Sequence, residues 1–238
     1  MQKLPFDIVF ENAELVAVNK PTGMLTLPDR HDGELQSLRG LLQAKFGHIF
    51  VIHRLDKDTS GVIVFAKDEV THKYMSQLFE GRSIEKIYLG LVHGNPEPPS
   101  GSIHEPISEH PAKNGTMVIH HKGKASHTDY EVVDNLGKFS LVSFNIHTGR
   151  THQIRVHSKF LGHPIACDPL YGDGKPVLVS SFKKKFKLSK KEEEEKPILA
   201  RLALHAHRIS FTDAHGQALS IEAPLPKDMR ALIAQLKK

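Results

Sequence analysis

Most apolar residues of this chain come in short runs with strand periodicity, and only a few stretches have helical spacing. Residues 8–10 and 15–18 flank a polar turn and predict a β-hairpin. Residues 62–66, Val-Ile-Val-Phe-Ala, predict a buried strand because they are uniformly apolar. Further strands are expected at 87–92, 129–133, 139–146, 202–211 and 219–221, with turns at 114–115 and 135–137. Many strands with few helices between them indicate an α+β fold.

Helices are expected at 38–46, 69–80, 151–161 and 228–237. Gly47 and Gly162 suit the ends of the first and third of these helices. Gly81 is expected to end the second helix by taking a positive φ angle, as glycine does without a steric penalty. Asp228 is a candidate N-cap for the last helix, because its side chain can accept a hydrogen bond from a free backbone N–H group.

The chain has 238 residues, enough for one sizeable core or for two modest lobes that share one. Its single cysteine, Cys167, excludes an intrachain disulfide and favours a reducing compartment. The N-terminus lacks the basic start and apolar run of a signal peptide, and no apolar stretch is long enough to span a bilayer. A cytoplasmic protein without membrane contact is therefore expected.

The charge of the chain gives only a weak indication of its partner. The formal net charge is +5, but residues 183–196 contain seven Lys and four Glu and contribute +3 of it, which leaves +2 for the rest. Such a low value would not by itself indicate a nucleic-acid partner. The favoured interpretation of residues 183–196 is a solvated surface loop, and the alternative is an arm that contacts RNA.

The most informative segment is 53–61, His-Arg-Leu-Asp-Lys-Asp-Thr-Ser-Gly, which leads directly into the predicted buried strand. It combines two carboxylates, two cations and two hydroxyl groups. Loops anchored on rigid strands commonly hold reactive groups. Residues 58–61 alone would be an ordinary turn, because Asp and Ser side chains stabilise turns.

Segment 53–61 resembles the signature of the RluA family of pseudouridine synthases. Further segments resemble other motifs of that family and follow its order: 18–23 (VNKPTG), 86–88 (KIY), 147–157 (HTGRTHQIRVH), 162–165 (GHPI) and 204–207 (LHAH). The resemblance extends over about residues 8–224. Several motifs in one order are much less probable by chance than one motif alone.

The resemblance implies one catalytic domain over residues 1–238, with a mixed, largely antiparallel, bent central sheet and flanking helices. Residues 175–197 are interpreted as a Lys/Glu-rich insertion. The extra S4-like RNA-binding module of many relatives is not expected, since the first family-like strand begins near residue 8. The implied activity is isomerisation of specific uridines in ribosomal or transfer RNA to pseudouridine by a monomeric enzyme.

The resemblance also implies roles for individual residues. Asp56 matches the catalytic nucleophile, although attack on uracil C6 and attack on ribose C1′ both remain open. Tyr88 would stack on the target base and could move a proton at C5. Arg155 matches the arginine that pairs with the nucleophile and would keep its carboxylate ionised. Arg150 is the second candidate for that pairing.

The residues expected to contact RNA are Lys20, His53, Arg54, Arg150 and His152. Arg54 would contact the RNA or fill the gap left by the target base, which must be extruded from its stack before it can react. No cofactor is expected, because the isomerisation is redox-neutral.

Several histidines raise the question of a metal. They are His120 and His121, the group His147, His152 and His157, and the pair His205 and His207. The sequence has no Cys pair and no His-Glu-x-x-His motif. Structural or RNA-facing histidines are therefore favoured, and no metal is expected.

Two other classes of function remain as alternatives. One is a non-catalytic RNA-binding or RNA-chaperone protein on the same scaffold, and the presence of Asp56, Tyr88 and Arg155 together disfavours it. The other is a carboxylate-dependent hydrolase of nucleosides or phosphates. That chemistry would want a metal cluster or a second positioned acid, and Asp58 is the only near candidate. Turnover on RNA, and on free nucleosides, distinguishes the three.

Overall fold

The computed structural model describes residues 4–28, 36–183, 186–187 and 194–238. The chain divides into two compact units. Unit 1 comprises Met1–Tyr88 and His205–Pro224, and unit 2 comprises Leu89–Leu204 and Leu225–Lys238. Among the described residues, no helix has the length and apolar character needed to cross a membrane.

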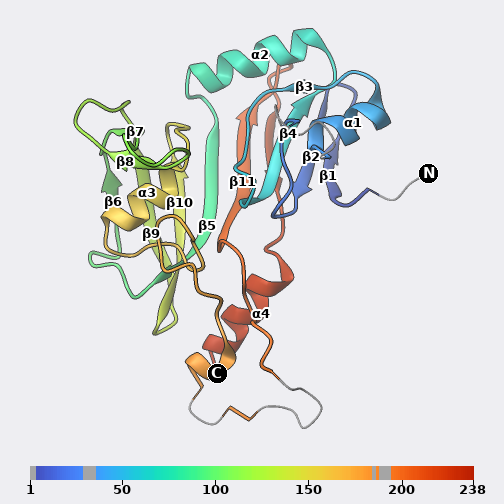
Figure 1. Ribbon diagram of the computed structural model, residues 1–238. Helices are drawn as coiled ribbons and strands as arrows, with labels where there is room; N and C mark the ends of the chain where they lie inside the picture. The colour runs from blue at the N-terminus through green and yellow to red at the C-terminus, as the bar shows by residue number, and fades with distance from the viewer. Residues whose placement is uncertain (1–3, 29–35, 184–185, 188–193) are drawn as a thin grey trace. The chain divides into compact units, whose positions relative to one another are not determined.

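The strands of unit 1 form a mixed sheet (Figure 1). Its order is β1 (Asp7–Glu11), β2 (Leu15–Lys20), β4 (Ser60–Ala66) and β11 (Leu204–Thr212), with β3 (Phe50–Val51) paired to β4 and β12 (Ala218–Glu222) paired to β11. The β4–β11 pair is parallel, and the other pairs are antiparallel. The predicted N-terminal hairpin is confirmed.

Strand β4 lies inside the core of unit 1, and all of its residues are buried. This confirms the buried strand expected from its uniformly apolar sequence. Gly61 adopts a φ of 122°, and a Cβ atom there would lie 2.1 Å from the carbonyl oxygen of Ala206 on β11. The close approach of the two parallel strands therefore requires glycine at the end of segment 53–61.

Helix α1 (Leu38–Phe46) begins and ends as its sequence predicts. The Ser37 hydroxyl accepts a hydrogen bond from the Gly40 N–H at 3.2 Å, which satisfies one free donor of the first turn. Gly47 takes a φ of 82° and ends the helix. Leu38 and Leu42 are fully buried and attach α1 to the core.

Helix α2 (Glu69–Glu80) also forms where expected, but its C-terminal end differs from the prediction. Asp68 caps its start by accepting a hydrogen bond from the Thr71 N–H at 2.8 Å. Gly81 does not take a positive φ, since its φ is −73°. The left-handed residue is instead Arg82, with a φ of 58°, so the chain leaves the helical conformation one residue later than predicted.

The strands of unit 2 are largely antiparallel (Figure 1). Their order is β5 (Glu85–His93, of which residues from Leu89 on belong to this unit), β10 (Phe139–Ile146), β9 (Thr128–Asn135) and β6 (Ser100–Ile103), with a separate pair, β7 (Ile107–Glu109) and β8 (Met117–Ile119). Gly137 and Gly115 have φ angles of 81° and 72°, which confirms the turns predicted there. Both units thus combine helices with largely antiparallel strands, as the α+β prediction requires.

Two helices belong to unit 2. Helix α3 (Gln153–Phe160) is buried over six consecutive residues, and its Val156 packs with Ile107 and Tyr171. Helix α4 (Lys227–Leu236) begins after Pro226, so the predicted N-cap at Asp228 is wrong. Asp228 lies inside the first turn, where its carboxylate forms an ion pair with Arg201 instead.

The segment interpreted as an insertion, 175–197, is only partly described. Its base is closed by a bridge between Val177 and Leu199, both of which are buried. A short 3-10 helix, η1 (Val179–Ser181), follows the first side of this bridge. Residues 184–185 and 188–193, with most of the Lys/Glu run, lie outside the described residues. The insertion and the single catalytic domain over residues 1–238 stay predictions.

Candidate active site

Asp56 lies on the loop that connects β3 to β4 in unit 1. Leu55 is 7% exposed and anchors this loop in the hydrophobic core. Arg54 is exposed and Asp56 is half-buried, so the residues on either side of the anchor differ in their access to solvent. The buried strand after the loop gives Asp56 a rigid support.

A second loop, between β2 and α1, holds the Asp56 loop on both sides. The Thr26 hydroxyl donates to the Leu55 carbonyl at 3.0 Å. The Thr22 hydroxyl donates to the Asp58 carbonyl at 2.8 Å. Both bonds end on backbone carbonyl groups, so they fix the path of the chain on either side of Asp56.

The buried side chain of Lys20 joins the same two loops by hydrogen bonds. Its side chain is fully buried, and its ammonium donates to the carbonyl groups of Pro21, Met24 and Lys57 at 3.1, 2.8 and 2.9 Å. An ammonium has three donors, and these three bonds use all of them. Lys20 therefore stabilises the Asp56 loop from inside the core, and its predicted contact with RNA stays a prediction.

Burial also changes the acidity of Lys20. Desolvation lowers its pKa from 10.5 to about 8, although the charges of Asp58 and Asp56 partly offset this shift. At neutral pH the ammonium stays mostly protonated. It therefore supplies a buried positive charge beneath the Asp56 loop.

Ser60, the first residue of β4, extends the polar network into β11. Its hydroxyl lies 3.0 Å from Nδ1 of His205, and Nε2 of His205 lies 3.1 Å from the carbonyl oxygen of Ala223. Since a carbonyl only accepts, Nε2 donates to Ala223 and Nδ1 accepts from Ser60. This arrangement gives the fully buried His205 a structural role that joins β4 to β11.

Tyr88 lies at the end of unit 1 on β5 and packs against the hydrophobic core of that unit. Desolvation, and after it the negative charge of Asp56, raises the pKa of the Tyr88 hydroxyl above its ordinary value of 10.0. The hydroxyl is therefore protonated at neutral pH. Unit 1 thus brings together three of the predicted residues, since the charge of Asp56 acts on both Lys20 and Tyr88.

His53 is a neutral ring in this environment. Its Nε2 accepts a hydrogen bond from the Val64 N–H at 3.1 Å, and its ring stacks on Phe79 with the centroids 4.8 Å apart. Desolvation, with a smaller effect of Lys86, lowers its pKa from 6.5 to about 3. Any contact of His53 with RNA would therefore lack a positive charge. The neighbouring Arg54 is exposed and keeps the predicted RNA-facing role.

Arg155 lies in unit 2, on α3, and forms a buried ion pair with Asp168. Its Nε and Nη2 donate to the two carboxylate oxygens at 2.8 Å each, and the two side chains are 3% and 0% exposed. The guanidinium also lies over the ring of Tyr171, 5.0 Å from its centroid. These contacts hold the planar fork of Arg155 in one orientation.

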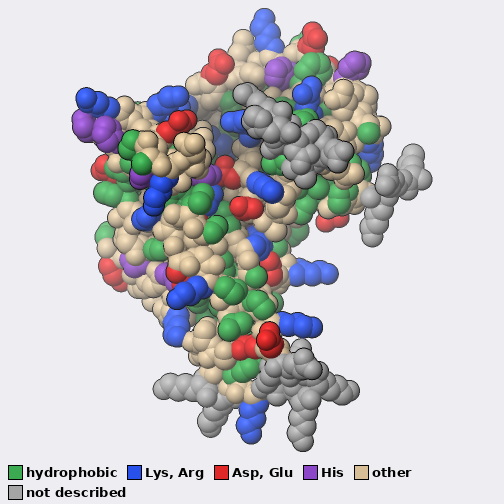
Figure 2. Space-filling view, in the orientation of Figure 1, with side chains coloured by type: hydrophobic (Ala, Val, Ile, Leu, Met, Phe, Trp, Pro, Cys, Tyr) green, Lys and Arg blue, Asp and Glu red, His purple; other side chains and the backbone are tan. Residues whose placement is uncertain are grey.

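The other predicted RNA contacts of unit 2 lie around the start of α3. His152 precedes the helix with a φ of 55°, and its Nδ1 lies 2.8 Å from the hydroxyl of Tyr171. Arg150 is half-buried and donates from Nε to the Ala125 carbonyl at 3.1 Å. Figure 2 shows Lys and Arg side chains scattered among Asp and Glu on the face in view, as the low net charge suggests.

Two parts of the predicted site thus belong to different units. Asp56 and Tyr88 lie in unit 1 and Arg155 lies in unit 2, so the pairing of Asp56 with Arg155 stays a prediction. The sequence analysis did not identify Asp168. Asp168 follows the apolar residues 165–167 and precedes Pro169, so its sequence context indicated a buried carboxylate. A buried carboxylate usually has a cationic partner, and this was the signal that could have pointed to Asp168.

The comparison with known protein families decides between the alternatives. Residues 14–159 match the family described as RNA pseudouridylate synthase. The chain belongs to this family. It is therefore an RNA pseudouridine synthase of the RluA type, an isomerase, as the sequence motifs predicted.

Individual relatives agree with this assignment. A ribosomal large subunit pseudouridine synthase D of Nitrosomonas europaea is 33% identical over 242 residues, which are 99% of this chain and 67% of that protein. An uncharacterized RNA pseudouridine synthase of Bacillus subtilis is 31% identical over 251 residues, covering 100% of this chain and 75% of that protein. The solved structure of human RNA pseudouridylate synthase domain containing 4 has a TM-score of 0.75 at 28% identity, over 97% of this chain and 92% of that one.

Proposed function

We propose that this pseudouridine synthase modifies specific uridines of ribosomal RNA, with Asp56 as its nucleophile and with the target base flipped out of its stack. The observation that carries the proposal is the placement of Asp56 on a loop clamped by Thr22 and Thr26, where its charge acts on Lys20 and Tyr88. Relatives named for the ribosomal large subunit, in Nitrosomonas europaea and in Buchnera aphidicola, favour ribosomal over transfer RNA.

The reaction is an isomerisation, so substrate and product contain the same atoms and differ in which base atom is bonded to the ribose. The bond between uracil N1 and ribose C1′ breaks, the base turns, and C5 bonds to C1′. C5 loses its proton and N1 gains one, so no external donor is needed. An ionised Asp56 forms the covalent adduct that allows the base to turn. The buried ammonium of Lys20 holds the backbone beside that carboxylate through its bond to the Lys57 carbonyl.

Tyr88 and Arg155 complete the proposed site. The Tyr88 ring offers a flat face to the flipped uracil, and its protonated hydroxyl can donate a hydrogen bond near C5. Arg155, whose guanidinium is oriented by Asp168, is proposed to pair with Asp56. Arg54, being exposed, is proposed to contact the RNA around the vacated position in the stack.

The test is a pseudouridine map of total RNA from cells that lack the gene, compared with cells that carry it. We expect one or a few ribosomal sites to disappear. They should return with a plasmid for the wild-type protein and not with Asp56→Asn. Sites lost from transfer RNA instead would contradict the ribosomal target, and restoration by Asp56→Asn would contradict the nucleophile.

A further inference from the structure

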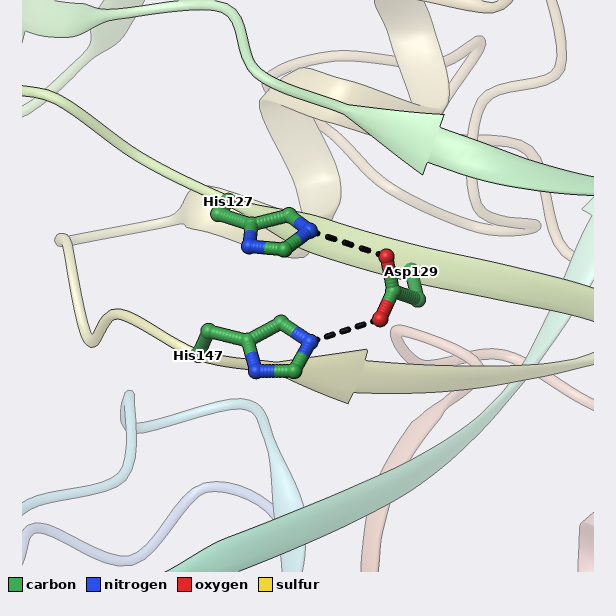
Figure 3. Close-up of side chains that lie close together, drawn as sticks. All are labelled: His127, Asp129 and His147. Carbon is green, nitrogen blue, oxygen red and sulfur yellow. Dashed lines mark hydrogen bonds and ion pairs between the residues drawn. The ribbon is translucent and has the colours of Figure 1, made fainter. Parts of the chain in front are cut away.

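Unit 2 carries a cluster of histidines around one carboxylate that the uridine chemistry does not use (Figure 3). His127 directly precedes β9, and Asp129 follows two residues later on the same strand face. His147 directly follows β10, and its backbone N–H donates to the His127 carbonyl at 3.1 Å. The pairing of β9 with β10 therefore places the three side chains together.

The two imidazole rings point at the same carboxylate. Nε2 of His127 lies 2.9 Å from one oxygen of Asp129, and Nε2 of His147 lies 2.6 Å from the other (Figure 3). The three potential ligand atoms all lie within 4.8 Å of one another. Two nitrogen donors and one oxygen donor thus converge on one point of the surface.

Neighbouring side chains hold this cluster in position. The Ser102 hydroxyl donates to Asp129 at 2.5 Å from β6, where the two residues face each other in the sheet. The ring of His127 stacks between those of His104 and His147, with centroids 4.1 Å from each. A fixed hydrogen-bond partner on a ligating carboxylate is typical of metal sites, where it orients the ligand.

We propose that His127, Asp129 and His147 bind a divalent transition-metal ion of the zinc type, with water in the remaining positions. Bond lengths of about 2.0–2.1 Å in a tetrahedral site place ligand atoms roughly 3.3–3.4 Å apart. The two nitrogen–oxygen distances must open by less than about 1 Å to reach this spacing. Rotation of exposed side chains is enough for such a change.

The exposure and the donor atoms fit such an ion. The side chains of His127, His147 and Asp129 are 32%, 38% and 39% exposed, so an ion and its water can reach them. Imidazole nitrogens select zinc, nickel, copper or cobalt, whereas magnesium and calcium prefer oxygen ligands. When the ion binds, it replaces the imidazole protons that now face the carboxylate. The site is proposed for binding alone and is independent of the target RNA.

The test measures metal affinity directly on the purified full chain. Zn²⁺ is titrated against a chromophoric chelator, and Co²⁺ is used as a spectroscopic probe of the ligand geometry. The ligand variants His127→Gln, His147→Gln and Asp129→Asn are compared with wild type. The matched control is His120→Gln/His121→Gln, which removes two exposed, neighbouring histidines with no place in the proposed site.

We expect one Zn²⁺ per chain, with affinity lowered roughly 100-fold by loss of any ligand and about tenfold by Ser102→Ala, which removes an outer partner. The double control should bind as wild type does. Zn²⁺ should also raise the melting temperature of wild type and of the control, because it binds the folded state. Equal affinity in wild type and all three ligand variants, or no saturable binding, overturns the proposal.

Discussion

The loop of Asp56 in unit 1 and the helix of Arg155 in unit 2 hold their functional side chains by different means. Around Asp56 the stabilising bonds end on backbone carbonyl groups, and they come from Thr22, Thr26 and the buried Lys20. Arg155 is instead held through its own guanidinium, by both oxygens of Asp168.

This difference predicts how each region responds to substitution. The bonds from Thr22, Thr26 and Lys20 end on the backbone of this loop, and Asp56→Asn keeps the shape of the side chain, so this change should affect the chemistry more than the fold. Arg155 and Asp168 form a buried ion pair. Removing one of them leaves the other as a buried charge that has lost this partner. Changes there should reduce stability and activity together.

The largest effect is expected for Asp56→Asn. The amide keeps the shape of the carboxylate but cannot act as the nucleophile, so pseudouridine formation should fall by about 10³-fold or more. The free energy of unfolding and the affinity for RNA should change little. The measurements are single-turnover product formation, urea unfolding and RNA binding.

Asp58→Asn is the matched control in the same loop, and its loss of activity should be far smaller. A hydrolase that uses Asp58 as its second acid would show the opposite result. Activity of Asp56→Asn within tenfold of wild type would remove Asp56 from the nucleophile's role.

The second-largest effect, a loss of both stability and activity, is expected for Asp168→Asn. Breaking a buried ion pair typically costs about 3–5 kcal/mol of stability, and Arg155 would also lose the partner that orients it. Asp228→Asn is the matched control, because Arg201 and Asp228 form a similar bidentate pair that is 14% and 34% exposed. The control should lose about 1 kcal/mol or less, as more exposed pairs do.

Urea unfolding and RNA turnover of both variants decide this point. Equal stability losses for Asp168→Asn and Asp228→Asn would show that burial does not distinguish the two pairs. Full activity in Asp168→Asn would show that Arg155 needs no orienting partner.

The third effect is expected for Lys20→Met, which removes three hydrogen bonds beneath the Asp56 loop. A loss of about 1–3 kcal/mol is expected at neutral pH, together with reduced activity, since buried carbonyl groups lose their donor. The folded pKa of Lys20 is lowered from 10.5 to about 8, so between these pH values the unfolded chain binds a proton that the folded chain does not.

The unfolding free energy of wild type should therefore rise between about pH 8 and pH 10.5, and that of Lys20→Met should lack this contribution. Lys113→Met, at an exposed position, controls for general effects of alkaline pH. If the unfolding free energies of wild type and Lys20→Met changed with pH in parallel, the lowered pKa of a buried Lys20 ammonium would be contradicted.

The smallest effect is expected for Tyr88→Phe. It keeps the stacking face and loses only the hydroxyl, so stability should change by less than about 1 kcal/mol. Release of the C5 hydrogen from tritiated uridine in RNA should slow, while RNA affinity stays the same. Tyr88→Leu should also lose about 1–3 kcal/mol of stacking with the base. Equal hydrogen-release rates for wild type and Phe would leave Tyr88 with stacking alone.

Much of this enzyme was determined by its sequence alone. Short apolar runs located the hairpin of β1 and β2 and the buried strand β4, because the apolar character of a segment is a local property of the chain. The motif at residues 53–61 indicated the family, which the comparison confirmed, because a motif depends on residue type and order. The role of Asp56 as nucleophile stays a prediction. Helices α1 and α2 begin at the side-chain caps Ser37 and Asp68, whereas α3 and α4 begin without a side-chain cap.

Only the tertiary structure decided how polar side chains pair. It buried Lys20 beneath the Asp56 loop, gave Arg155 the partner Asp168, and brought His147 to His127 and Asp129. Lys20 and the Lys57 carbonyl are 37 residues apart, Arg155 and Asp168 are 13 apart, and His147 and Asp129 are 18 apart, so no local pattern joins them. The cost of burying an unpaired charge makes such partners necessary, but the fold decides which side chain meets which.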